Sequence, residues 1–566
     1  MVDLRSSPFY LSDNDIAWVT DKLACMSLDE KIGQLFMPVG LSSDEDELRN
    51  TIESFKPAGM MFRPGLGKEV QSTHRFLQSC SDIPLLIASN LESGGTGSAI
   101  DGTEFGCQMQ TAATDDVEMV RGLARISAIE GKALGVNWTF GPVVDLDINP
   151  NNPITNVRTF GSDKNKVKYY SSEYIKEVRK QGMATAAKHF PGDGIDDRDQ
   201  HIVPTYNSLT KEEWDTSYGE IYQEVIAADS LSIMVGHISL PSYSQYLKPT
   251  LDFEDVLPAS LSPEILQGLL RGKLGFNGLI VTDASAMVGF TSVMLRKYSV
   301  PAAIAAGCDI FLFNKDLAED FQYMKQGIAE GRLSMERVDE AITRTLAMKA
   351  ALKLHQIDKD ELVPQEQALE LIGNQAHKNL ANMCAEKSIT LVKDRDDFLP
   401  IDPHKQPNVL LFTLTDDGDF FGNKTNVFAP AIELLESKGF KVDLFDPSNF
   451  KMRDVKLSVE DMRKKYDFAL YFSNIKPASN KTSLRLNWTR PMGIDAPWFC
   501  AELSTVFVSF GNPYHLYDVP RVQTYINAYT ANVETIRATI NCLLGNKSFS
   551  GKSPVDPFMG RIDMQV

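Results

Sequence analysis

Residues 184–201 read ATAAKHFPGDGIDDRDQH, and the fold of the chain can be predicted outward from this stretch. It opens with a short apolar run that ends in Lys188 and His189 and continues into a turn with two glycines. An apolar run of this length, closed by a glycine-rich turn, is typical of a buried β-strand. The stretch ends in Asp199 and His201, and a histidine two residues from a carboxylate can exchange protons near neutral pH.

Seven further apolar runs of similar length flank this one, and segments with helical amphipathicity separate them. They are Ile32–Val39, Gly59–Phe62, Leu85–Ser89, Val136–Val144, Ile233–His237, Leu279–Thr282 and Cys308–Phe313. Short apolar runs separated by helices predict parallel strands joined by right-handed crossovers. Eight such units predict an α/β fold of the (β/α)8 TIM-barrel type, which typically takes about 250 residues. An open doubly wound sheet is the alternative.

Polar residues follow six of the expected strands at the point where each strand ends. They are Asn90, Asp145, His189, His237, Asp283 and Asn314. In a barrel of parallel strands the carboxyl ends form the rim that carries the active site. We therefore expect a site at this rim.

The chain of 566 residues is long enough for more than one domain. We expect the catalytic barrel over residues 1–355, a helical linker over 356–387 and an αβα sandwich domain over 388–566. Strand-like runs at Ser388–Lys393, Asn408–Thr413, Phe468–Phe472 and Thr505–Phe510 support the last of these.

Composition excludes some classes of protein. The formal net charge of −18 disfavours binding to nucleic acid and to an anionic membrane surface. The seven cysteines are scattered without paired spacing, which is typical of free thiols in a reducing compartment. No signal-peptide pattern and no apolar run of about 18 residues is apparent, so we expect a cytoplasmic protein without a membrane span.

Asp283 directly follows the expected strand Leu279–Thr282. A carboxylate held rigidly at a strand end can attack an electrophilic carbon as a nucleophile. Aspartate is also favoured as the N-cap of a following helix, so both roles remain open from position alone.

The residue pair Asp199 and His201 allows three interpretations. His201 can be a general acid/base whose imidazole is oriented by Asp199. Alternatively, the segment is a solvated acidic loop, or Asp196, Asp197, Asp199 and His201 form a metal site.

Two further positions are candidates for binding a ligand. Lys188 ends an apolar run, where a buried ammonium group is costly unless it pairs or meets a ligand. Arg158 follows the turn-rich stretch Asn149–Pro153 and could clamp a substrate or form an ion pair within a loop.

The chain resembles glycoside hydrolase family 3, in the branch of the β-N-acetylglucosaminidases. The resemblance is carried, in the family's order, by Met26–Leu35, Gly141–Asp145, Arg158–Gly161, Lys188–Gly192 with its Asp-x-His, and Thr282–Asp283. In the second domain it continues through Ser388–Val392, Leu399–Ile401 and Phe510–Tyr514. The branch follows from the Asp-x-His pair, because the β-glucosidases of the family take a glutamate acid/base from another region.

The resemblance implies that Asp283 is the nucleophile and that His201, assisted by Asp199, is the acid/base. It also implies that Arg158, Lys188 and His189 bind the sugar at the point of cleavage.

Three departures from the family pattern concern substrate binding. Asp193 stands where the family often has histidine. The third strand leads into Asn90-Leu91-Glu92, where the family usually has Asp-x-Glu, so either Asn90 or Glu92 can serve as the sugar-binding residue. The family's following arginine is also missing, and Arg63 is a candidate substitute.

From this resemblance we expect a retaining, exo-acting β-N-acetylglucosaminidase that works through a covalent glycosyl-enzyme and needs no metal or organic cofactor. Its partner is a small carbohydrate substrate. One alternative is a phosphorylase that uses phosphate as acceptor, and another is a carbohydrate-binding protein without turnover.

Overall fold

The computed structural model describes residues 2–62, 65–415, 426–445, 458–488 and 490–565. The chain forms two compact units. The first comprises residues 1–104, 120–152 and 164–378, and the second comprises 105–119, 153–163 and 379–566. The proposed domain boundaries at residues 355 and 388 remain a prediction.

The first unit is built on parallel strands. In chain order these are β1 (Phe36–Met37), β2 (Val39–Gly40), β3 (Gly59–Phe62), β4 (Leu86–Ser89), β5 (Trp138–Thr139), β6 (Ala184–Phe190), β8 (Ser232–Val235), β10 (Leu279–Thr282) and β11 (Phe311–Leu312). Neighbours pair in the order β10-β8-β6-β5-β4-β3-β2, and every one of these pairings is parallel.

The ends of this curled sheet are connected through β11. A parallel bridge joins Val281 to Ile310, and β11 pairs with β1, which continues into β2 after Pro38. The strands are buried along nearly their whole length, as expected where helices surround a barrel. The predicted (β/α)8 barrel is confirmed.

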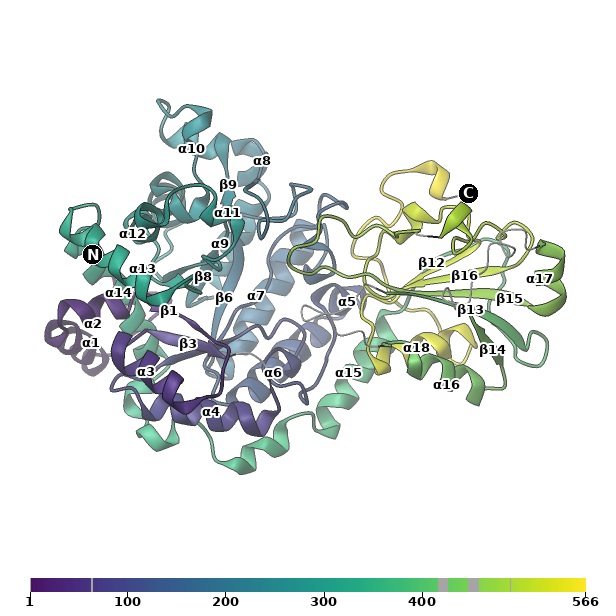
Figure 1. The fold of residues 1–566 in the computed structure, drawn as a ribbon, viewed down its shortest axis with the longest axis horizontal. Coiled ribbons are helices and arrows are strands. Elements are labelled where there is room, and N and C mark those ends of the chain that lie inside the picture. The colour runs from purple at the N-terminus through teal and green to yellow at the C-terminus, as the bar shows by residue number, and fades with distance from the viewer. Residues whose placement is uncertain (1, 63–64, 416–425, 446–457, 489, 566) are drawn as a thin grey trace. The chain divides into compact units, whose positions relative to one another are not determined.

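Helices alternate with these strands (Figure 1). They are α1 (Asp13–Cys25), α2 (Leu28–Gly33), α3 (Glu45–Phe55), α4 (Gly67–Ser79), α6 (Val117–Ala133), α7 (Lys164–Lys180), α8 (Lys211–Asp215), α9 (Tyr218–Ala227), α10 (Pro241–Leu247), α11 (Val288–Thr291), α12 (Arg296–Ala306), α13 (Leu317–Ala329), α14 (Met335–Ala351) and α15 (Gln375–Ser388). A π-helix spans Glu264–Lys273. A small parallel pair, β7 (Thr205–Tyr206) with β9 (Ile238–Ser239), lies apart from the barrel sheet.

The expected strand Ile32–Val39 was wrong in its first residues. Ile32 belongs to α2, and strand structure begins at Phe36. The reason is a capping box, in which the Ser27 hydroxyl accepts the Glu30 amide and the Glu30 carboxylate accepts the Ser27 amide. This cap starts a helix four residues before Ile32 and carries it through Gly33.

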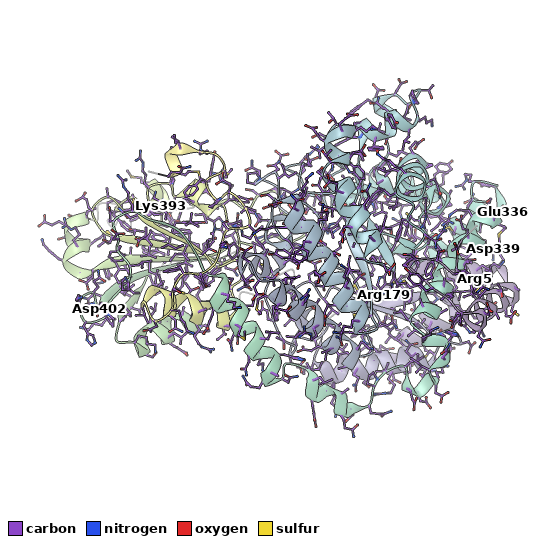
Figure 2. All side chains as sticks on the ribbon, turned by 180° about the vertical axis from the view of Figure 1, so that it is seen from behind. Arg5, Arg179, Glu336, Asp339, Lys393 and Asp402 are labelled. Carbon is purple, nitrogen blue, oxygen red and sulfur yellow. The ribbon has the colours of Figure 1, made fainter. Side chains whose placement is uncertain are left out.

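The N-terminal segment is fixed to the barrel by polar contacts. The guanidinium of Arg179, which is labelled in Figure 2, donates to the carbonyl oxygens of Asp229 at 2.6 Å and Pro8 at 3.0 Å. Lys31 of α2 pairs with Asp339 of α14 at 2.6 Å. These contacts tie the helices at the start of the chain to helices far along it.

The second unit contains a six-stranded sheet in the order β12-β17-β16-β15-β13-β14. The strands are β12 (Thr390–Asp394), β13 (Asn408–Thr415), β14 (Lys441–Leu444), β15 (Phe468–Asn474), β16 (Thr505–Ser509) and β17 (Thr524–Asn527). All pairs are parallel except β12 with β17. Because β14 and β15 flank β13 on opposite sides, the winding of the sheet reverses direction at β13.

Both faces of this sheet are covered. One apolar cluster joins the sheet to α15, α16 (Ala429–Ser437) and α18 (Val533–Leu543), and Figure 1 shows α16 and α18 on the same side of the strands. A second cluster joins the other face to α17 (Val459–Lys465) and the short helix His515–Asp518. The predicted αβα sandwich is confirmed.

A third apolar cluster of the second unit draws on three separate stretches of chain. Met109 and Ala113 come from α5 (Gln108–Ala113), and Val157 comes from the segment 153–163. They pack with residues near the end of the chain, namely Tyr514, Tyr529 and Val555. The unit is therefore discontinuous in sequence.

Among the described residues, no helix is both long and apolar enough to cross a membrane.

Candidate active site

The last residues of β6 carry a histidine that a buried aspartate holds. His189 Nδ1 lies 2.7 Å from Oδ2 of Asp145. Asp145 follows β5 in the sequence and is fully buried. The same carboxylate accepts the backbone N–H groups of His189 at 3.1 Å and of Asp193 at 2.8 Å. Three donors on one carboxylate fix the orientation of the imidazole ring.

Lys188 lies beside His189 and pairs with a different strand end. Its Nζ lies 2.6 Å from Oε1 of Glu92 and 3.5 Å from Oδ1 of Asn90, both of which follow β4. The lysine side chain is only 4% exposed, and that of Glu92 is 17% exposed. Such an ion pair can position two hydrogen-bonding groups rigidly for a ligand.

Asp283 follows β10, where its N–H donates to the carbonyl of Val235 at 2.8 Å. Burial raises the pKa of its carboxyl group, but the electrostatic interactions with His189, His237 and His201, with the hydrogen bond from the Ala284 N–H, outweigh this effect and leave the pKa below its usual value. The residue is partly exposed, and its lowered pKa leaves the carboxyl group ionised at neutral pH. These properties suit a nucleophile.

The pair predicted from the sequence forms in the structure. His201 Nδ1 lies 2.6 Å from Oδ1 of Asp199, which also accepts the His201 backbone N–H at 2.9 Å. The Asp199 side chain is fully buried, and that of His201 is 23% exposed. The Val288 N–H donates to the carbonyl of His201 at 3.0 Å, so the start of α11 fixes the segment.

Asp196 has partners outside the suggested metal site. It pairs with Arg198 at 2.6 Å and accepts the backbone N–H of Tyr206 at 2.9 Å. Across the described ranges, no group of three or more histidine, cysteine, aspartate or glutamate side chains could hold a metal ion.

His237 has partners for both ring nitrogens. Nδ1 lies 2.8 Å from the Ser260 hydroxyl and Nε2 lies 3.1 Å from the carbonyl of Ala284. Because a carbonyl only accepts, Nε2 carries the proton and Nδ1 accepts from the serine. Burial lowers the pKa of His237 although Asp283 opposes this, so the ring stays neutral at pH 7. It is thus a support for the strand end rather than a second proton donor.

Gln200 connects this support to the glycine turn after β6. Its Oε1 accepts the His237 backbone N–H at 2.7 Å, and its Nε2 lies 3.3 Å from Oδ2 of Asp193. The turn itself requires glycine at position 192, where φ is +122° and a Cβ would come within 2.3 Å of the Tyr218 ring. The segment that presents His201 is accordingly anchored at several points.

Asp193 is a buried carboxyl group beside Asp145. Burial, with a further contribution from the Asp145 charge, raises the pKa of Asp193 to about 6. Its Oδ1 accepts from Asn152 Nδ2 at 3.0 Å and from the Gly194 amide at 2.7 Å. Within the described part of the chain its carboxyl group bonds to Asn152, Gly194 and Gln200, so the residue has a structural place in the turn.

Comparison with known proteins identifies the family. Residues 27–348 match the family model described as the glycosyl hydrolase family 3 N-terminal domain. A Cellulomonas fimi protein named beta-N-acetylglucosaminidase/beta-glucosidase is 42% identical over 568 aligned positions, which cover 100% of each chain. The chain belongs to glycosyl hydrolase family 3.

Two solved structures show the same fold. One named beta-glucoside phosphorylase BglX, bound to 2FGlc, has a TM-score of 0.94 and 42% identity, covering 98% of this chain and 99% of that chain. A family 3 beta-N-acetylglucosaminidase from Paenibacillus sp. str. FPU-7 has a TM-score of 0.77 and 23% identity, covering 94% and 99%. At that identity the second likeness concerns the fold alone.

For two further predicted sugar-binding residues of this family 3 chain, the structure gives no sugar-binding role. Arg63 is outside the described residues. Arg158 lies in a short helix, Asn156–Arg158, of the segment 153–163, which belongs to the second unit. Its guanidinium donates to the carbonyl of Ile154 at 3.0 Å. The roles of both arginines remain predictions.

Sequence reasoning placed Asp145 and His237 at the rim without giving either a role in the site. The structure makes Asp145 the partner of His189 and makes His237 the link between Gln200 and the start of the Asp283 loop. Their position at strand ends was the signal. Gln200 gave no such signal, because its role depends on a long-range contact with His237.

Proposed function

We propose that the chain is a retaining, exo-acting β-N-acetylglucosaminidase of family 3 that removes terminal β-linked N-acetylhexosamine. The observation that supports this best is the combination of an ionised, accessible Asp283 with an Asp199–His201 pair, both on the carboxyl-end loops of one barrel. The C. fimi relative, 42% identical along its whole length, carries beta-N-acetylglucosaminidase in its name.

The first half of the proposed reaction forms a covalent glycosyl-enzyme. His201 donates a proton to the glycosidic oxygen, and the Asp283 carboxylate attacks the anomeric carbon as the leaving group departs. Asp199 orients the imidazole and stabilises the protonated ring before transfer. An ionised Asp283 at neutral pH supports this step, because a protonated carboxyl group is a poor nucleophile.

In the second half, the neutral imidazole of His201 takes a proton from water as the water attacks the anomeric carbon. The bond to Asp283 breaks and the sugar leaves with its original configuration. Two inversions give net retention. The same imidazole therefore serves as acid and then as base.

The proposed sugar-binding residues are Lys188, His189, Asn90 and Glu92, with Arg158 and Arg63 as further predictions. Lys188 and Glu92 are nearly buried and pair with each other, so each can present a hydrogen bond to a sugar hydroxyl from a fixed position. The dual name of the C. fimi relative makes glucose a second candidate for the recognised sugar.

Phosphorolysis is the second candidate function, and one likeness favours it. The structure named beta-glucoside phosphorylase BglX is 42% identical over 98% of this chain. In the second half-reaction a neutral imidazole repels a phosphate dianion less than a carboxylate base would. Phosphate in place of water would yield a sugar 1-phosphate of retained configuration.

Release of 4-nitrophenol from its β-N-acetylglucosaminide and its β-glucoside, each with and without inorganic phosphate, tests the proposal. We expect release from the acetamido sugar to be at least about tenfold faster, with free sugar as the product. Faster release with phosphate, together with a sugar 1-phosphate in the product spectrum, would establish phosphorolysis instead. Saturable sugar binding without any release from either substrate would indicate a carbohydrate-binding protein without turnover.

A further inference from the structure

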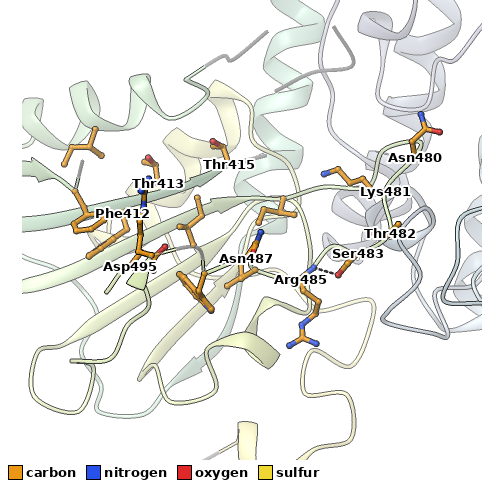
Figure 3. Close-up of a pocket in the computed structure, with 17 residues that line it drawn as sticks. Phe412, Thr413, Thr415, Asn480, Lys481, Thr482, Ser483, Arg485, Asn487 and Asp495 are labelled. Carbon is orange, nitrogen blue, oxygen red and sulfur yellow. Dashed lines mark hydrogen bonds between the residues drawn. The ribbon is translucent and has the colours of Figure 1, made fainter. Parts of the chain in front are cut away.

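The sheet of the second unit has a cavity at the point where its winding reverses. The cavity lies at the carboxyl ends of β13, β14 and β15 and has a volume of about 650 Å³ (Figure 3). Ligands of open parallel sheets bind in the crevice outside the carboxyl ends of the strands, at this kind of reversal. A cavity of this size falls within the usual range for small-molecule sites, about 300–1,000 Å³.

Uncharged polar side chains line much of this cavity. They come from the end of β13 and from the segment 480–487, and they are Thr413, Thr415, Asn480, Thr482, Ser483 and Asn487. Hydroxyl and amide groups both donate and accept hydrogen bonds. This lining therefore suits a ligand that carries many hydroxyl groups.

Aromatic side chains form another part of the wall. Phe412 and Phe445 line the cavity and stack with ring centroids 4.6 Å apart, and Trp488 lines it as well. The C–H faces of a pyranose ring are apolar and pack on flat aromatic surfaces while the hydroxyls reach polar groups at the edge. The aromatic and the polar parts of the lining therefore match the apolar faces and the hydroxyl groups of a sugar, respectively.

Asp495 provides an independent indication of a missing ligand. Its side chain lines the cavity and the residue is 9% exposed, yet its buried Oδ1 has no hydrogen-bond partner among the described residues. Leaving a buried polar group without a hydrogen-bond partner is destabilising, and more so for a charged group. A donor from a bound molecule would satisfy this oxygen.

The charged side chains that line the cavity are Lys481, Arg485, Arg490 and Asp495. Arg485 is held by Asp518 through its Nε at 2.6 Å, and Lys481 donates to the carbonyl of Lys476 at 2.9 Å. An anionic ligand placed at Asp495 would meet the like charge of its carboxylate. Sugar hydroxyls, in contrast, donate to a carboxylate.

We propose that the second unit carries a carbohydrate-binding site of its own, in which Trp488 packs against a sugar ring and Asp495 accepts its hydroxyl groups. All the residues that form it belong to the second unit. The ligand is a mono- or disaccharide, and the residues proposed for cleavage, Asp283 and His201, do not line this cavity.

The experiment reads binding directly at this site in the full-length chain. The chain has five tryptophans, and labelling with 5-fluorotryptophan gives each a fluorine resonance. A Trp488→Phe variant identifies the resonance of Trp488. The Asp283→Asn background prevents turnover while N,N′-diacetylchitobiose, cellobiose and inorganic phosphate are titrated separately.

We expect at least one of the two disaccharides to shift the Trp488 resonance saturably, and Asp495→Ala to weaken this binding at least tenfold. Asp461→Ala, which changes an exposed aspartate of α17, is the matched control and should leave the binding unchanged. Release of 4-nitrophenol by Asp495→Ala in the otherwise unaltered chain should match the parent enzyme, which also shows that the variant folds.

A Trp488 resonance that neither disaccharide moves would overturn the proposal, as would a shift caused by phosphate alone. An Asp495→Ala variant that binds sugar as tightly as the parent would also overturn it. The outcome is separable from the proposed function. If the parent chain cleaves substrate but no disaccharide shifts the Trp488 resonance, the proposed function holds and the binding site does not. If a disaccharide shifts this resonance saturably but the parent chain cleaves nothing, the binding site holds and the proposed function does not.

Discussion

In the barrel, Nδ1 of His201 and Oδ1 of Asp199 lie 2.6 Å apart, with the carboxylate fully buried and the imidazole partly exposed. The aspartate therefore takes the inner nitrogen of the ring, and Nε2 is left as the nitrogen that can exchange a proton with a substrate. A carboxylate in this place also specifies which tautomer the neutral ring adopts.

Replacing the Asp199 carboxylate should show that catalysis depends on this contact with His201. We expect Asp199→Asn to lower kcat on 4-nitrophenyl substrates by at least about 100-fold, because the amide can select the wrong imidazole tautomer. The loss in the first half-reaction should be smaller with a 2,4-dinitrophenyl leaving group, which needs little protonation. Asp197→Asn changes an exposed aspartate of the same segment and should retain the parent rate. Equal losses with both leaving groups would argue against an acid/base role.

Removal of the proposed nucleophile should abolish turnover. We expect Asp283→Gly to lose at least about 10³-fold in kcat while keeping its unfolding transition. Azide fits the vacated space and should restore cleavage of an activated substrate, giving a glycosyl azide of inverted configuration. Product analysis by NMR checks this. A variant with the parent rate would show that Asp283 is only a cap for the chain that follows.

The Lys188–Glu92 pair should couple binding to stability. Glu92→Gln leaves a nearly buried ammonium group without its countercharge, and we expect a loss of about 3–5 kcal/mol in the free energy of unfolding. The KM for the β-glycoside should rise at least about tenfold if Glu92 also binds the sugar. The double variant Glu92→Leu/Lys188→Met removes both charges and should recover stability but not KM. If the double variant recovered both the stability and the KM of the parent, Lys188 and Glu92 would not be part of the sugar-binding site.

Asp193 should make stability fall as pH rises. Its pKa is about 6 in the folded chain against 3.8 for the free side chain, so folding favours the protonated form. The contribution is fully present below about pH 4 and is lost as pH rises through about 6. Asp193→Asn lacks this titration, so denaturant unfolding of both proteins at pH 4 and pH 7 should show the variant gaining relative to the parent. If the free energies of unfolding of the variant and the parent differed by the same amount at pH 4 and at pH 7, the raised pKa of Asp193 would be contradicted.

Lys349 should act in the opposite direction. Its Nζ is buried and donates to Gln34 Oε1 at 3.0 Å, and burial lowers the pKa of its ammonium group to about 7 from 10.5. Stability linked to this group is fully present above about pH 10.5 and is lost as pH falls through about 7. Lys349→Met should therefore be more stable than the parent at pH 6, with the advantage shrinking towards pH 10. Thermal unfolding across this range checks the expectation, and Lys359→Met, an exposed control, should show no such trend.

The sequence predicted the barrel because its strands are buried on both faces and their apolar runs are therefore nearly continuous. It missed two strands of the second unit, Lys441–Leu444 and Thr524–Asn527. The first lies at the edge of its sheet and alternates charged with apolar residues, so no continuous run marks it. The second, TYIN, lies inside its sheet, but polar residues stand at both of its ends, so it contains no continuous apolar run that would mark a buried strand.

Within the candidate site, neighbours in sequence were predictable and long-range partners were not. The Asp199–His201 contact spans two residues, and its spacing predicted it. The contact between Gln200 and His237 spans 37 residues, and it depends on the relative placement of two strand ends that periodicity does not specify. The same limit applies to the Lys188–Glu92 pair, for which the two residues were predicted separately.

The discontinuity of the second unit constrains how this gene could be divided or recombined. A fragment of the chain that ends near residue 378 would still contain Met109, Ala113 and Val157. Their apolar partners lie beyond residue 500 and would be missing. A swap of carboxyl-terminal domains between homologues at a single crossover would mismatch these packing surfaces. Only exchange or inheritance of all three stretches together preserves the packing, so the two units are expected to evolve as one inherited block.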